Sequence, residues 1–240
     1  MTEGAAAPWP LLRDVLDMPL HPGGQAATAA LLDRAGVAPG TVMVDVGCGA
    51  GEALELARDR GATAVGVDAA PAGTGTVRGE MTALPVATGA ADVVLAECTL
   101  CLATDFDGAL VEARRVLGTD GRLAISEMTV DGEVPALPPR LERTLCLAGR
   151  RDESWIVDRI EAAGLRVRDQ RDHTGDLLEM RDDLAERVDY DGLLRLLDDG
   201  GAVADGIERL ETAVENGTIG YVSLVAESTL SQRSVGQRDV

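Results

Sequence analysis

Lysine is absent from this chain, and aromatic residues make up only 2% of it. All 22 basic residues are arginines, and 41 acidic residues give a formal net charge of -19 at pH 7. A surface this acidic repels nucleic acid phosphates and anionic lipid, so composition disfavours nucleic acid and membrane partners. A small molecule is the expected partner, and the oligomeric state is left open.

Long apolar runs are also missing, and no stretch approaches the length of a transmembrane helix. The first eight residues have no basic region before an apolar run, as a signal peptide requires. These absences predict a cytoplasmic protein, in which the four cysteines are expected to be thiols. With 240 residues, 45% of them hydrophobic, the chain can bury the core of one domain, residues 1–240.

A glycine-rich segment follows the first expected strand, Val42–Val46. It predicts a tight turn in which Gly47 and Gly49 allow a ligand close to the backbone, and Gly51 allows the helix expected over 52–60 to begin near the strand. A second strand over 64–68 ends on Asp68, whose carboxylate can accept hydrogen bonds from ribose. Strand, glycine turn, helix and acidic strand end are typical of a nucleotide-binding βαβ unit.

The glycine spacing and the flanking charges indicate which nucleotide is bound. The spacing is G-x-G-x-G, whereas dinucleotide-binding turns have G-x-G-x-x-G. Asp45 before the loop and Glu52 after it would repel a pyrophosphate, but they suit a ligand with an ammonium and a sulfonium. The pattern therefore favours S-adenosylmethionine (SAM) and disfavours an NAD-dependent oxidoreductase.

Over Val37–Gln170 the chain resembles the class I SAM-dependent methyltransferases, in particular the small-molecule group with the ubiquinone and menaquinone C-methyltransferases. Asp45–Gly51 is similar to the family's first motif, and Arg78–Pro85 to its adenine-flanking segment G-D-A-x-x-L-P, with Glu80 in place of Asp. The cofactor-binding residues that the motifs and the resemblance imply are Asp45, Gly47, Cys48, Gly49, Gly51, Asp68, Ala69, Glu80, Met81 and Glu97.

The expected fold is α/β: a Rossmann-like, doubly wound, mostly parallel seven-stranded sheet with the last strand antiparallel. Strands are expected near 42–46, 64–68, 76–79, 92–96, 122–127 and 165–171, within a core of 37–171. Residues 1–36 form an N-terminal cover with helices over Trp9–Met18 and 24–35. A helical insertion over 174–214, broken at Gly200, precedes a last strand over 218–226 and a disordered tail over 228–240.

Candidate catalytic residues follow the strands, because ligands of open α/β sheets bind beyond the carboxyl ends of the strands. Glu97 follows the fourth strand, and His173 follows the sixth. His21 lies in a loop between the two N-terminal helices. Each of the three could accept a proton from a hydroxyl or amine substrate. A surface histidine that caps a turn is the alternative for both histidines.

The cysteines allow a second interpretation. Cys48 is explained by packing, because the glycine loop needs a small residue. Cys98, in Ala96–Ala103, and Cys146, in the segment 146–149, are similar to the two cysteines that hold trivalent arsenic in arsenite methyltransferases. Cys98 and Cys101 form a C-x-x-C pair, but no second pair accompanies it, so no metal site is expected. Burial in the core explains Cys98 and Cys146 equally well.

The leading interpretation is a SAM-dependent methyltransferase that acts on a small molecule. An arsenic(III) or other thiophile methyltransferase that uses Cys98 and Cys146 is one alternative, and a SAM-binding protein without catalytic turnover is another.

Overall fold

The computed structural model describes residues 21–133, 142, 145–147, 151–187 and 200–229. The helix expected over Trp9–Met18, most of the N-terminal cover and the tail from 230 lie outside these ranges. The described helices are α2 (Gly24–Ala35), α3 (Glu52–Asp59), η1 (Leu100–Leu102), α4 (Phe106–Val116), α6 (Glu153–Ala162), α7 (Thr174–Arg187) and α9 (Gly200–Glu215). The strands are β1 (Val42–Val46), β2 (Thr63–Asp68), β3 (Thr76–Arg78), β4 (Ala91–Glu97), β5 (Leu117–Val130), β6 (Leu165–Asp172) and β7 (Ile219–Ser228).

The seven strands form one sheet in the order β3-β2-β1-β4-β5-β7-β6. Neighbours from β3 to β5 run parallel, whereas β7 is antiparallel to both β5 and β6. This arrangement confirms the expected Rossmann-like fold with an antiparallel last strand. The chain leaves β1 toward one edge of the sheet and returns to β4 on the other side of β1, so the topological switch point lies between β1 and β4.

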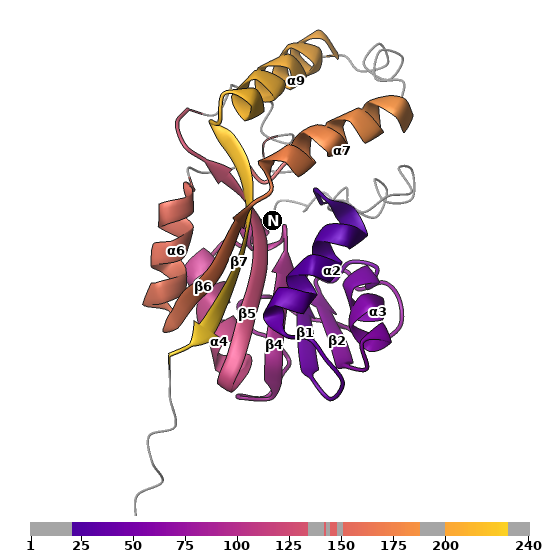
Figure 1. Ribbon diagram of the computed structural model, residues 1–240, viewed down its shortest axis with the longest axis vertical. Coiled ribbons are helices and arrows are strands. Elements are labelled where there is room, and N and C mark those ends of the chain that lie inside the picture. Colours follow the sequence, from indigo (N-terminus) through magenta and orange to yellow (C-terminus); the bar gives the residue numbers. More distant parts are fainter. Residues whose placement is uncertain (1–20, 134–141, 143–144, 148–150, 188–199, 230–240) are drawn as a thin grey trace, which may run out of the picture.

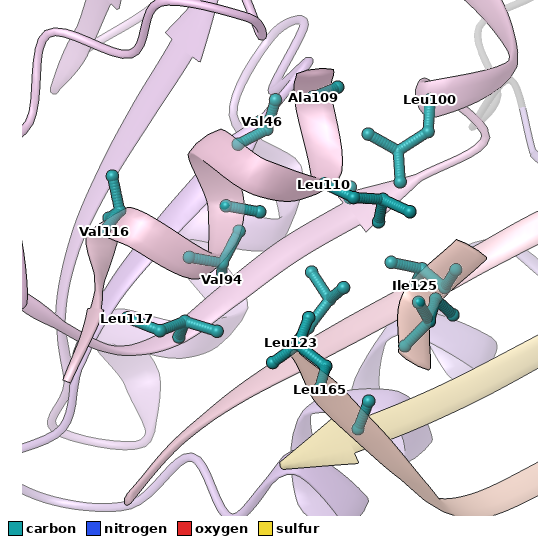
Figure 2. Close-up of a cluster of buried hydrophobic side chains, with 14 of the residues drawn as sticks. Val46, Val94, Leu100, Ala109, Leu110, Val116, Leu117, Leu123, Ile125 and Leu165 are labelled. Atoms are coloured by element: carbon teal, nitrogen blue, oxygen red, sulfur yellow. The ribbon is translucent and has the colours of Figure 1, made fainter. Parts of the chain in front are cut away.

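Helices cover both faces of this sheet (Figure 1). On one face α2 and α3 pack leucines and alanines against Met43 and Leu95 of the inner strands. On the other face α4 and α6 pack against Val94 and Ile125, and Figure 2 shows part of this larger cluster. The inner strands read as nearly continuous apolar runs because both faces are buried, as in other parallel sheets.

Local signals fix the helix ends. Asp105 accepts a hydrogen bond from the Gly108 backbone N–H at 2.9 Å, which caps α4, and Asp152 caps α6 through the Trp155 N–H at 2.8 Å. Helix α2 ends at Gly36, whose φ of 78° places it in the left-handed conformation that glycine adopts without strain.

Three predicted boundaries differ from the structure. Strand β5 covers Leu117–Val130 rather than 122–127, because β7 pairs with it as far as Val130 and Leu117 pairs with Ala91. Strand β7 continues to Ser228, so the expected disordered tail cannot begin there. Gly200 is the first residue of α9 and Gly201 follows it within the helix, so the expected break does not lie at this glycine pair.

The carboxyl ends of the parallel strands share one edge, here called the carboxyl edge, which comprises the ends of β1, β2, β4, β5 and β6. Helix α7 leaves β6 at this edge, and α9 returns to it to begin β7, so both helices lie beyond the sheet there (Figure 1). Within the described ranges, no helix is both long and apolar enough to cross a membrane.

Candidate active site

The glycine loop after β1 is held against β2 and leaves open space on its other side. The Gly47 N–H donates to the Val67 carbonyl at 2.7 Å, and a Cβ on Gly47 would lie 2.0 Å from the Thr99 hydroxyl oxygen. A Cβ on Gly49, by contrast, would meet no atom within 4 Å. The loop therefore presents the Gly49 backbone to an open space in which a ligand could approach closely.

Asp68, the last residue of β2, is fixed by this loop. Its Oδ2 accepts from the Gly49 N–H at 3.0 Å, and its Oδ1 accepts from the Ala70 N–H at 2.7 Å. A carboxylate has about four lone-pair positions, so each oxygen keeps capacity for a further donor such as a ribose hydroxyl. Ala69 beside it is exposed, as is Glu80 beyond β3, whereas Met81 packs partly against the core.

Asp45 of β1 and Glu97 of β4 lie on the same face of the sheet. Asp45 is in register with Leu95, and Glu97 is two residues further along β4, so both side chains point toward α2 and α3. Burial raises the pKa of Asp45 well above its usual value, and the carboxylates of Glu97, Asp68 and Glu52 raise it further. This convergence of acidic groups around the loop suits a cationic ligand, which would favour the ionised carboxylates.

Thr28 of α2 and His21, which precedes this helix, lie beside Glu97. The Thr28 hydroxyl donates to Glu97 Oε2 at 2.9 Å and lies 3.3 Å from His21 Nε2. Burial raises the pKa of Glu97, while His21 and the Thr28 hydrogen bond act in the opposite direction. His21 and Glu97, two candidates far apart in sequence, are thus brought together through a threonine.

Cys48 packs as expected. Its Sγ occupies the space beside Gly66, where a Cβ on the glycine would be only 2.4 Å from the sulfur. Burial, followed by the charges of Asp45 and Asp68, raises the pKa of Cys48 to about 12, which keeps the thiol protonated.

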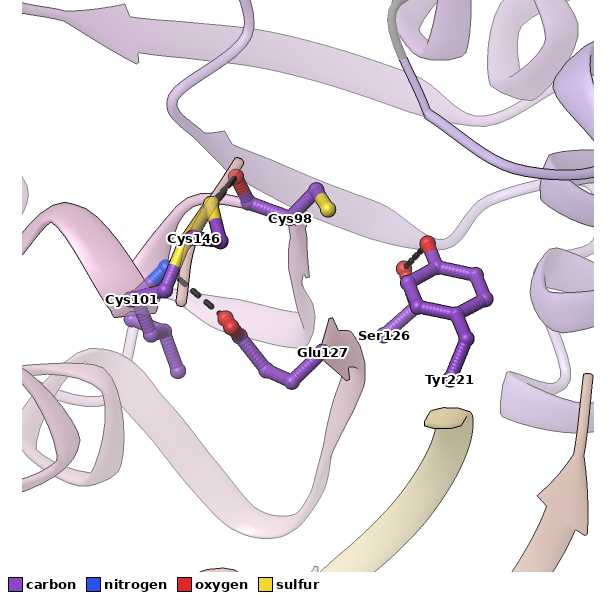
Figure 3. The surroundings of a disulfide bond; sticks show 7 residues. Cys98, Cys101, Ser126, Glu127, Cys146 and Tyr221 are labelled. Carbon is purple, nitrogen blue, oxygen red and sulfur yellow. Dashed lines mark hydrogen bonds between the residues drawn. A yellow bond between two sulfur atoms is a disulfide. The ribbon is translucent and has the colours of Figure 1, made fainter. Parts of the chain in front are cut away.

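The expectation of four thiols is wrong. Cys101 and Cys146 form a disulfide (Figure 3) with a Cα–Cα distance of 5.4 Å. Cys48 and Cys98 are free. Cysteine pairing is not readable from spacing, and the partner of Cys146 is Cys101 rather than the Cys98 of the arsenite resemblance. Burial and the neighbouring Glu127 raise the pKa of the Cys98 thiol, so Cys98 is not a ready thiolate.

Glu127 supports the turn that carries these cysteines. It is 1% exposed, and its Oε1 accepts from the Leu100 N–H of η1 at 2.9 Å. Burial raises the pKa of Glu127 to about 8, although Arg151 and the backbone donors of η1 lower it. Among the described residues other than glycine, Cys98 (φ 51°) and Cys146 (φ 58°) have positive φ, and such conformations cluster at functional sites.

The disulfide gives a first prediction. When the protein is unfolded in denaturant without reductant, a chromogenic thiol reagent should detect two thiols, those of Cys48 and Cys98. After reduction it should detect four. Reduction should also lower the free energy of unfolding by about 2–4 kcal/mol, the usual effect of opening a loop of this size. Cys101→Ser should lower the free energy of unfolding similarly. Cys48→Ser should keep the disulfide and show one thiol, rather than two, without reductant. Four titratable thiols without reductant would rule out the pairing.

Both ring nitrogens of His173 lie close to other side chains. Its Nε2 lies 2.8 Å from Ser223 Oγ, and its Nδ1 lies 3.2 Å from Asp176 Oδ2. Both ring nitrogens therefore already have protein partners, so His173 would have to release one before it could act as a base. Nearby, the buried Tyr221 hydroxyl donates to Ser126 Oγ at 2.7 Å (Figure 3).

Comparisons with known proteins fit this geometry. Residues 44–125 match a family model described as a methyltransferase domain. The chain is 28% identical over 185 residues to the methyltransferase GfsG of Streptomyces halstedii. That match covers 68% of this chain but only 63% of GfsG, less than two thirds of the relative's length.

Solved structures share the fold over most of the chain. The [4+2]-cyclase SpnF has a TM-score of 0.73 and 22% identity, covering 94% of this chain and 93% of SpnF. Geranyl diphosphate C-methyltransferase from Streptomyces coelicolor A3(2), with bound Mg²⁺, geranyl diphosphate and S-adenosylhomocysteine, has a TM-score of 0.66 and 17% identity over 84% of this chain and 79% of its own. Residues 44–125 are thus similar to a methyltransferase domain, and the chain shares the fold of these structures.

The matched part of the methyltransferase domain contains the glycine loop, Asp68, Glu80 and Glu97. His21, Cys146 and His173 lie outside it, and Thr28 was not expected at all. Nothing in the sequence marks Thr28, because a threonine within a helix usually bonds to the carbonyl four residues earlier. Thr28 also lies 3.4 Å from the Gly24 carbonyl, so its contact with Glu97 is visible only in the folded chain.

Proposed function

We propose that this protein binds SAM at the glycine loop and transfers its methyl group to a small-molecule acceptor. The observation that carries the proposal is the arrangement of Asp45, Asp68 and Glu97 around the open side of Gly49. Asp68 has acceptor capacity for ribose hydroxyls beside an unobstructed backbone. Asp45 and Glu97 supply the negative charge that the ammonium and sulfonium of SAM require.

SAM, when bound, supplies an activated methyl group on its sulfonium. The residues of this chain bind and orient: Asp68 takes the ribose, Asp45 and Glu97 take the cationic end, and Ala69, Glu80 and Met81 flank the adenine. The loop glycines Gly47, Gly49 and Gly51 and the packed Cys48 shape the cradle. Methyl transfer is an in-line displacement, so the main task left is to hold the acceptor atom near the methyl carbon.

The acceptor would enter at the carboxyl edge, where α7 and α9 stand beyond β5, β6 and β7. A hydroxyl or amine acceptor must lose a proton, for which Glu97, His21 and His173 are the candidates at this edge. The net charge of -19 supports a small acceptor rather than a nucleic acid. A single methyltransferase domain over residues 1–240 and a cytoplasmic location belong to the same proposal.

The thiophile alternative is weaker than the general one. Its soft ligands would be the thiolates of Cys98 and Cys146, but Cys146 is bonded to Cys101 and the raised pKa keeps the Cys98 thiol protonated. The second alternative is a SAM-binding protein without catalytic turnover, and one structure with this fold carries the name of a cyclase.

Two measurements test the proposal. Calorimetry should show binding of SAM and S-adenosylhomocysteine and no binding of NAD. Incubation with methyl-labelled SAM and panels of phenols, amines, thiols and arsenite should then release S-adenosylhomocysteine with at least one small acceptor. NAD binding without SAM binding would refute the cofactor assignment. SAM binding without turnover on any acceptor class would favour the non-catalytic alternative.

A further inference from the structure

A buried hydroxyl connects the start of α2 to the acidic end of β4. Thr28 is 2% exposed, and α2 packs on the sheet face toward which Asp45 and Glu97 point. The Thr28 hydroxyl lies between Glu97 Oε2, at 2.9 Å, and His21 Nε2, at 3.3 Å. His21 Nδ1 lies 3.2 Å from the Pro22 carbonyl oxygen, which can only accept a hydrogen bond.

The donors and acceptors in this chain of groups can be counted. Because Pro22 O accepts, the proton on His21 Nδ1 is fixed. If Glu97 is ionised, Thr28 donates to it, and His21 Nε2 must carry a proton to donate to Thr28. If Glu97 is protonated, it donates to Thr28, and Thr28 donates to a neutral His21. Both arrangements satisfy every group, and both contain the same number of protons.

The two arrangements differ only in where one proton resides. The change starts from protonated Glu97 and neutral His21. The Glu97 carboxyl proton passes to Thr28 Oγ1 while the Thr28 hydroxyl proton passes to His21 Nε2. The O–H bond of Glu97 breaks, an N–H bond forms on His21, and no proton enters or leaves the protein. The result is an imidazolium on His21 and a carboxylate on Glu97, formed without exchange of a proton with solvent.

We propose that Thr28 and His21 are positioning residues for the cofactor: they orient the Glu97 carboxylate and take up its proton when SAM binds. The inference rests on the proposed function, because it assumes that the cationic end of SAM lies beside Glu97. A cation there favours the ionised carboxylate, and the relay lets Glu97 ionise without releasing its proton to solvent.

The other charged groups around Glu97 make this transfer useful. Asp45 faces it from β1, and Glu52 and Asp68 add negative charge around Asp45. The Cys98 thiol, directly after β4, and the Tyr221 hydroxyl of β7 lie nearby, and burial raises the pKa of both. Burial raises the pKa of Glu97, which favours its protonated form, and a cationic ligand beside it would favour the ionised carboxylate. His21 is the basic group at hand to receive the proton.

Calorimetry of SAM binding to the full chain tests the proposal, with Thr28→Val as the main variant. Valine keeps the shape of threonine and removes the hydroxyl. SAM affinity should fall about tenfold or more, the effect expected when a hydrogen bond to a charged group is lost. In buffers of different ionisation enthalpy, Thr28→Val should release more protons on binding than the unaltered protein, because Glu97 must then lose its proton to solvent.

Matched variants separate this role from helix stability. Thr28→Ser keeps the hydroxyl and should restore both affinity and proton release. Thr212 of α9 makes the same bond to the carbonyl four residues earlier, at 3.0 Å, on an exposed surface. Thr212→Val should therefore change neither quantity. His21→Asn should reproduce the extra proton release of Thr28→Val. Because His21 precedes α2, this substitution should disturb the folding of the helix less.

Nitrogen chemical shifts give a direct signature, because the chain has only two histidines. With His173→Gln used for assignment, the His21 ring should shift toward the imidazolium form when SAM is added, and should not shift in Thr28→Val. An unmoved His21 signal, or equal affinity and proton release in Thr28→Val and the unaltered protein, would overturn the relay. Failure of the unaltered protein to bind SAM would instead overturn the proposed function, on which the relay depends.

Discussion

Asp68→Ala is expected to lower the affinity for SAM by at least about a hundredfold, since two ribose hydroxyls each lose a bond to a charged acceptor. The variant removes a second contribution as well. Asp68 holds the Gly49 N–H at 3.0 Å, so its loss also frees the loop that must be ordered when the ligand binds. Both effects act on the same equilibrium, which makes this one of the two largest losses expected from a single substitution.

Asp92→Ala is the matched control. Asp92 Oδ2 likewise accepts a backbone hydrogen bond, from Val42 at 2.8 Å, but it lies at the start of β4, away from the carboxyl edge. Titration calorimetry should therefore give normal SAM affinity for Asp92→Ala and greatly reduced affinity for Asp68→Ala, with circular dichroism showing both folded. Equal affinities in the two variants would remove Asp68 from the cofactor site.

The part of the site around Asp68 was predictable because its determinants are local. Strand β1 has the predicted bounds, and β2 and α3 differ from prediction by one residue. The two strands are mostly apolar runs ended by glycine or charge, and α3 begins directly after Gly51 with its apolar residues on one side. Strand, turn and helix follow one another directly in the chain, so the positions of Asp45, Gly49 and Asp68 follow from sequence order.

Contacts between distant segments were not predictable in the same way. The length of β5 depends on pairing with β7, about a hundred residues later, which no local pattern encodes. The Cys101–Cys146 disulfide joins residues 45 positions apart, whereas the arsenite methyltransferase resemblance had placed Cys98 with Cys146. Thr28 reaches Glu97 across 69 positions and carries no signal of its own. The proposed acceptor side of the site depends on such contacts, which is why its chemistry was the harder part to infer.

Gly49→Val is expected to abolish SAM binding while leaving the protein folded. A Cβ at this position meets no protein atom within 4 Å, so the added side chain occupies only the open space in front of the loop. The φ of 51° is unfavourable for a β-branched residue, which should cost about 1–2 kcal/mol of stability. A folded chain with a blocked loop is therefore the expected product.

The neighbouring glycine shows why the position matters. On Gly47 a Cβ would lie 2.0 Å from Thr99 Oγ1, so a substitution there disturbs the protein itself and reports on folding rather than on the ligand. Gly89 is the better control, because it also has positive φ (70°) and open space around its Cβ, but it precedes β4 at the opposite edge. Gly89→Val should match the stability loss of Gly49→Val, measured by thermal unfolding, and still bind SAM. If Gly49→Val binds SAM as tightly as Gly89→Val does, the cofactor does not approach this loop, and the acidic groups around it must serve another ligand.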